Sequence, residues 1–125
     1  MTTTPDGPET TITHEDLGDE LRRIVITGRL DTPGTNEISE QLRELAAVPR
    51  RGIVVDLSAV AFMASIAIGQ LILNAKEVKS RGGHMVVIAS GTGAVMMSLK
   101  STATDRIIPV FPYASDAYAA ALRGF

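Results

Sequence analysis

An apolar run that is followed by a helical stripe constrains the fold of this chain more than any other feature. Residues 53–55 (IVV) are continuously apolar, which is typical of a parallel strand that is buried on both faces. A loop is expected after Leu57. Beyond it, apolar residues recur at helical spacing, at Ile68, Leu71, Ile72 and Ala75. This order predicts a central strand and a helix that packs against the sheet.

The remaining segments alternate in the same way. Apolar runs predict strands near residues 11–13 and over residues 21–30, 85–89 and 107–111, and helices are expected to begin at Thr32, Thr92 and Ser115. Strands that alternate with helices predict an α/β fold, with a mostly parallel sheet of four or five strands and about four helices packed against it.

The length of the chain sets its domain organisation. A chain of 125 residues forms one domain, which we place at residues 11–125. Residues 1–10 (MTTTPDGPET) are polar and contain two prolines. This segment is expected to be a disordered tail.

The composition argues against several functional classes. A net charge of -2 argues against nucleic acid as a partner, because nucleic-acid-binding proteins usually carry a basic patch. The absence of cysteine excludes disulfides, thiolate metal sites and a cysteine nucleophile. No apolar run approaches the length of a membrane span, and the N-terminus lacks a signal-peptide core. We therefore expect a cytoplasmic protein.

The titratable residues do not form a recognisable catalytic set. His14 and His84 have no carboxylate or cysteine at ligand spacing. No serine–histidine–acid arrangement and no paired carboxylates stand out. The sequence therefore predicts no enzyme activity, no metal and no cofactor.

Ser65 stands where the loop gives way to the helix. A serine in this place is expected to be the helix N-cap, beside free backbone N–H groups and the positive end of the helix dipole. A phosphate on its hydroxyl would meet favourable electrostatics there. Local chemistry alone is compatible with both a structural cap and a phosphorylation site, and caps are the commoner case.

Four blocks of the sequence resemble the STAS domains of bacterial anti-sigma factor antagonists. Residues 56–69 (DLSAVAFMASIAIG) are similar to the family pattern D-L-S-x-V-x-F-[IM]-D-S-S-G-[LI]-G. Residues 28–31 (GRLD) resemble its G-[ER]-L-D segment, and residues 81–88 resemble its G-G-x-[ML]-V-[VL] strand entry. Residues 107–111 and Ala117 match the late strand and the start of the last helix. The blocks occur in the family's order and spacing.

The resemblance implies a partner switch. It places the phosphoacceptor at Ser65, and the partner would be an ATP-dependent anti-sigma factor serine kinase. It further implies that a partner-binding surface is formed by Asp31, Ala64, Ser65, Ile66, Ala67 and Ile68. Asp31 is equally compatible with a plain Asx-turn role before Pro33. The resemblance is also compatible with a phosphatase as a second partner and with a homodimer.

Three residues depart from the family pattern around Ser65. Ala64 replaces an aspartate, Ile66 a serine and Ala67 a glycine. These changes make the segment more apolar, which favours an alternative function. In that alternative the chain is a STAS subunit without a switch, or a ligand-binding module, inside a larger signalling or lipid-transport complex.

Overall fold

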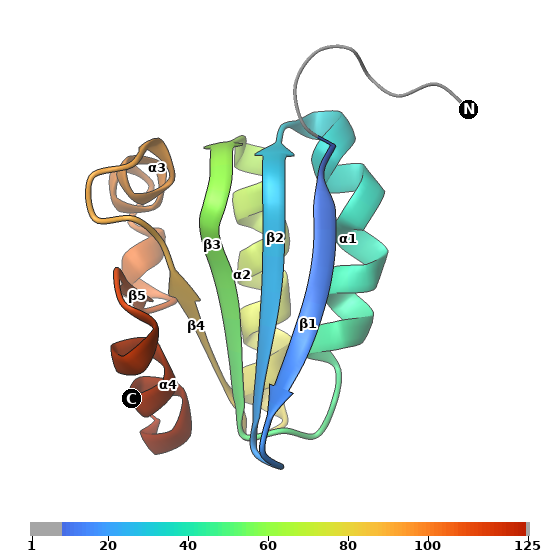
Figure 1. Ribbon diagram of the computed structural model, residues 1–125, viewed down its shortest axis with the longest axis vertical. Coiled ribbons are helices and arrows are strands. Elements are labelled where there is room, and N and C mark those ends of the chain that lie inside the picture. The colour runs from blue at the N-terminus through green and yellow to red at the C-terminus, as the bar shows by residue number, and fades with distance from the viewer. Residues whose placement is uncertain (1–8, 125) are drawn as a thin grey trace.

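The computed structural model describes residues 9–124, which form five strands, four α-helices and one 3-10 turn (Figure 1). In chain order these are β1 (Thr11–Leu17), β2 (Leu21–Leu30), α1 (Thr32–Ala46), β3 (Gly52–Met63), α2 (Ser65–Ser80), β4 (His84–Ile88), α3 (Ala94–Ser101), η1 (Thr104–Arg106), β5 (Val110–Phe111) and α4 (Ala114–Arg123). Most of the expected tail, residues 1–8, lies outside the described residues.

The sheet follows the chain order, β1-β2-β3-β4-β5. β1 pairs with β2 antiparallel, whereas β2 with β3, β3 with β4 and β4 with β5 pair parallel. The predicted mostly parallel α/β sheet is therefore confirmed, with β3 in its centre. Parallel neighbours need a crossover, and α1, α2 and α3 supply the crossovers.

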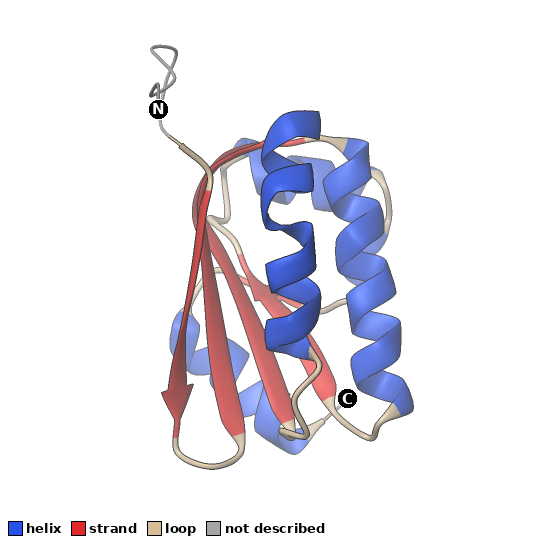
Figure 2. Ribbon diagram, turned by 90° about the vertical axis from the view of Figure 1, so that its right-hand side faces the viewer, coloured by secondary structure: helices blue, strands red, loops and turns tan. Residues whose placement is uncertain are grey.

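Helices cover both faces of the sheet (Figure 2). The larger core lies between the sheet and α1, α2 and α3, where Ile24, Ile53, Leu71 and Leu99 are at most 1% exposed. A smaller core, which includes Val54 and Val86, lies under α4 on the opposite face. Residues 53–55 alternate between the two cores, which explains why the run is continuously apolar.

β3 continues six residues beyond its expected end at Leu57, to Met63. Its pairing with β2 changes register between Val25 and Thr27 and again between Gly28 and Arg29, and each change leaves one additional residue on β3. Such β-bulges disturb the alternation of buried and exposed side chains. The expected loop after Leu57 is therefore wrong, and the segment is a bulged strand.

Gly28 lies at the second change of register, in a backbone conformation that favours glycine. Its φ angle is +97°, and a Cβ atom placed on it would lie 2.7 Å from the backbone oxygen of Glu9. A side chain at this position would require an unfavourable backbone conformation and would collide with the backbone of Glu9. β2 continues through Gly28 to Leu30, where the sequence predicts its end.

The helices begin close to the predicted positions, but with different caps. The N-caps are Asp31 for α1, Ala64 for α2, Gly93 for α3 and Tyr113 for α4. Ser65 is thus the first residue of α2 rather than its cap, and Thr32 is the first residue of α1. The last strand is shorter than expected, because the turn that follows η1 occupies residues 107–109.

Candidate functional site

The carboxyl ends of β2 and β3 bring Asp31 and Ser65 to one edge of the sheet. Leu30 pairs with Met63, and the backbone N–H of Ala64 donates a hydrogen bond of 2.9 Å to the carbonyl of Leu30. Asp31 directly follows Leu30, and Ser65 directly follows Ala64. In Figure 1 the arrowheads of β2 and β3 point to this edge, where α1 and α2 begin.

Asp31 has a structural role at this edge. Its Oδ1 atom accepts a hydrogen bond of 2.8 Å from the backbone N–H of Gly34, in the first turn of α1. Its Oδ2 atom lies 3.6 Å from Nε of Arg29. An acidic N-cap satisfies a free helix N–H group and complements the helix dipole. The Asx-type role of Asp31 therefore coexists with a position next to Ser65.

Ser65 is an exposed residue at the start of α2. Among residues 9–124 its hydroxyl makes no hydrogen bond. Ala64 is half-buried and the side chain of Ile66 is 38% exposed, but Ala67 and Ile68 are only 2% and 7% exposed. Burial removes Ala67 and Ile68 from the surface and assigns them to the larger core. The accessible part of the predicted surface is therefore Asp31, Ala64, Ser65 and Ile66.

Two residues that the sequence did not single out complete this edge. The guanidinium carbon of Arg29 lies 4.7 Å from the centre of the Phe62 ring, a cation–π contact across the β2–β3 pair. The Phe62 side chain is 38% exposed. The signal in the sequence is an aromatic residue at the end of β3 opposite an arginine, but the two bulges hide it.

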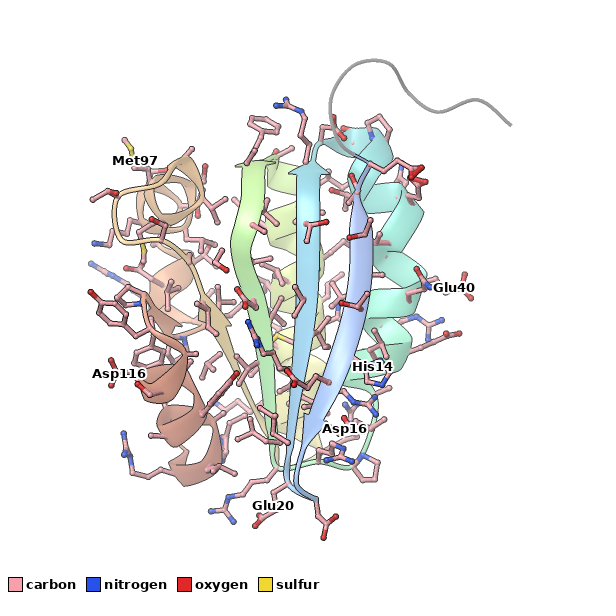
Figure 3. All side chains as sticks on the ribbon, in the orientation of Figure 1. His14, Asp16, Glu20, Glu40, Met97 and Asp116 are labelled. Atoms are coloured by element: carbon pink, nitrogen blue, oxygen red, sulfur yellow. The ribbon has the colours of Figure 1, made fainter. Side chains whose placement is uncertain are left out.

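A third exposed apolar residue lies at the same end of the molecule. Met97, on α3, is 68% exposed, and Figure 3 shows its side chain near the level of the β2 and β3 arrowheads. Phe62, Ile66 and Met97 are thus exposed apolar residues at the end of the molecule where α2 begins with Ser65. We call these three residues, with Arg29, Asp31, Ala64 and Ser65, the carboxyl-edge surface.

A buried charge network braces β3 before it reaches this surface. The Asp56 side chain, 3% exposed, accepts hydrogen bonds from Nε and Nη2 of Arg23 on β2. It also accepts bonds of 2.9 Å from the backbone N–H of Ser58 and 2.6 Å from its hydroxyl. Burial alone would raise the pKa of Asp56, but the bonds from Ser58 and Arg23 outweigh it and hold the pKa below its usual range. The same pairing raises the pKa of Arg23.

Substitution of Asp56 by asparagine is expected to lower the free energy of unfolding by about 1–3 kcal/mol at pH 7, because the charged acceptor of these bonds is lost. The folded-state pKa lies below the unfolded value of about 3.9. The stabilisation from the carboxylate is therefore complete above the unfolded pKa and lost as the pH falls through the folded one. Urea unfolding, measured from pH 7 to pH 3, gives the difference in unfolding free energy between wild type and Asp56→Asn. This gap should narrow below about pH 4. A gap that stays constant with pH would contradict this role.

The family model of the STAS domain matches residues 16–117, which is most of the chain. The chain belongs to the STAS domain family. This STAS domain is also similar to solved structures. An anti-sigma factor antagonist from Mycobacterium paratuberculosis has a TM-score of 0.82 and 22% sequence identity, over 96% of this chain and 98% of that chain.

Two further neighbours share the fold. SpoIIAA in its unphosphorylated form has a TM-score of 0.70 and 15% identity, over 92% of this chain and 98% of that chain. The Bacillus cell fate determinant SpoIIAA in the phosphorylated form has a TM-score of 0.63 and 14% identity, over 87% of this chain and 97% of that chain. At these identities the likeness establishes the fold of this STAS domain.

The described part of this STAS domain, residues 9–124, offers neither a metal-binding cluster nor a membrane-spanning helix. No group of three or more histidine and acidic residues there could hold a metal ion. No helix within residues 9–124 is both long and apolar enough to span a bilayer. The carboxyl-edge surface is thus the feature on which a functional argument rests.

Proposed function

We propose that this STAS domain is an anti-sigma factor antagonist that binds an anti-sigma factor serine kinase and is switched by phosphorylation of Ser65. The exposed Ser65, whose hydroxyl makes no hydrogen bond among residues 9–124 and which lies close in sequence to the exposed Phe62 and Ile66, carries this proposal. Binding of the anti-sigma factor would free the sigma factor, so the protein would regulate transcription in the cytoplasm and would itself not be an enzyme.

The switch follows from local electrostatics. The kinase would transfer the γ-phosphoryl group of ATP to Oγ of Ser65, ADP would leave, and the hydroxyl proton would pass to a base of the kinase. The phosphoserine carries about two negative charges. Ala64, Ile66 and Phe62 lie within three residues of Ser65, so a partner bound over these apolar side chains would have to desolvate this charge. Release of the partner is the expected consequence.

The neighbours in fold support this function. They include anti-sigma factor antagonists, and one of them, SpoIIAA, is described in unphosphorylated and phosphorylated forms. We carry that cycle over to this chain through Ser65, the residue that matches the family's phosphoacceptor. A phosphatase that removes the phosphate would complete the cycle.

Ile66 allows a sharp test of the binding surface. Its replacement by serine should weaken binding to the cognate anti-sigma factor kinase by about tenfold or more, since an exposed apolar side chain at the centre of an interface is lost. Candidate kinases are the histidine-kinase-like ATPases encoded in the same genome, purified and titrated by calorimetry.

Ile107→Ser is the matched control. Ile107 is 50% exposed and lies beside Lys79 and His84, away from the carboxyl ends of β2 and β3. This variant should bind like wild type. Equal losses in both variants, or no binding of any such kinase by the wild type, would favour the alternative: a STAS subunit without a switch, in a larger signalling or lipid-transport complex. The apolar Ala64, Ile66 and Ala67 are the residues that favour that alternative.

A further inference from the structure

Arg29 is held loosely at the carboxyl-edge surface. Its Nε atom is 3.6 Å from Oδ2 of Asp31, and its guanidinium covers the Phe62 ring at 4.7 Å. The side chains of Arg29 and Asp31 are 48% and 39% exposed. An exposed ion pair of this length contributes little to stability. The guanidinium is therefore free to exchange its partner for a stronger anion.

The pairing of β2 with β3 places Arg29 near Ser65. Arg29 pairs with Phe62, and Leu30 pairs with Met63. The hydrogen bond from the backbone N–H of Ala64 to the carbonyl of Leu30 extends the contact between these two segments to the residue before Ser65. Arg29 lies on the strand, Asp31 at the start of α1 and Ser65 at the start of α2, so all three converge on one edge.

Other arginines are engaged elsewhere. Arg22 and Arg50 pair with Asp16 on β1, and Arg23 pairs with Asp56. Arg81 donates to the carbonyl of Ala46 at the far end of α1. None of these four contacts involves the carboxyl-edge surface, whereas the pairing of β2 with β3 brings Arg29 toward Ser65.

We propose that Arg29 is the internal receptor of the phosphate on Ser65. The inference rests on the proposed function, and it adds a rearrangement to the change in charge. A phosphate dianion offers a guanidinium two acceptor oxygens and more charge than the single carboxylate of Asp31. Once Ser65 is phosphorylated, Arg29 leaves Asp31 and the Phe62 ring and binds the phosphate. The modification therefore alters the carboxyl-edge surface at Phe62 as well as at Ser65.

The test places phosphoserine at position 65 during translation of the full chain, so that no kinase is needed. The second ionisation of the phosphate, with a pKa of about 6, is followed by ³¹P NMR between pH 5 and pH 8. A nearby cation favours the dianion and lowers this pKa. The midpoint in the wild type should lie about 0.5 unit or more below that of Arg29→Gln. Arg29→Lys keeps the positive charge but not the planar guanidinium with its paired donors. Its titration midpoint should lie between those of wild type and Arg29→Gln.

Arg43→Gln is the matched control, because Arg43 is an exposed arginine in the last turn of α1, at the opposite end of the sheet. It should titrate like the wild type. Far-UV circular dichroism checks that all variants are folded. Equal midpoints for wild type and Arg29→Gln would overturn the role of Arg29 and leave the proposed function standing. Failure to find a kinase for Ser65 would instead count against the proposed function and would not affect this titration.

Discussion

Replacement of Leu71 by alanine is expected to lower the free energy of unfolding by about 2–5 kcal/mol. Leu71 is 1% exposed and lies on α2 in the larger core, between the helices and the sheet. The core contains few aromatic side chains, since the whole chain has three phenylalanines, two tyrosines and no tryptophan. A cavity under α2 therefore removes a large share of the contacts that hold this helix to the sheet.

Leu73 provides the control on the same helix. Its side chain is 60% exposed, so Leu73→Ala should leave stability within about 0.5 kcal/mol of wild type. Urea unfolding followed by circular dichroism distinguishes the two variants. Equal effects of the two substitutions would show that the face of α2 that packs against the sheet is not the one that carries Leu71.

Substitutions of Ser65 are expected to change kinase binding without a large change in stability. Ala64 is the N-cap of α2 and makes no side-chain capping bond, so Ser65→Ala removes no cap and should change stability by less than about 0.5 kcal/mol. It should bind the kinase like the unphosphorylated wild type. Ser65→Asp adds a carboxylate at the positive end of α2, which the helix dipole tolerates.

The aspartate is expected to weaken kinase binding by about 10- to 100-fold, because its charge would be desolvated in an apolar interface. Thermal melts and calorimetric titrations of both variants test this. A Ser65→Asp protein that is folded and binds as tightly as the wild type would show that charge at this position does not control the complex.

The order of the elements could be predicted from the sequence because each signal is local. Residues 53–55 are apolar on both faces of a strand, and Ile68, Leu71, Ile72 and Ala75 follow at helical spacing. Alternation of strands and helices then leaves few topologies, and a mostly parallel sheet is the common one. The central place of β3 follows from the same apolar run.

The carboxyl-edge surface could be predicted only in part. The resemblance located Asp31 and Ser65, but Phe62 was hidden because the bulges opposite Thr27 and Arg29 break the period of two in β3. The caps were missed for another reason. Asp31 and Thr32 are adjacent and both can cap a helix, and the extended backbone of Asp31 with its side-chain bond to the N–H of Gly34 shows that Asp31 is the cap. Burial of Ala67 and Ile68 likewise depends on how α2 packs.

The proposed partner switch depends on Ser65 as its phosphoacceptor. The most direct measurement incubates the wild-type chain with its candidate kinase and Mg-ATP, then maps the phosphate by mass spectrometry of peptides. We expect one phosphate, on Ser65, and none on the Ser65→Ala chain under the same conditions. A stable complex that leaves Ser65 unmodified, or a phosphate on another residue that persists in Ser65→Ala, would contradict it.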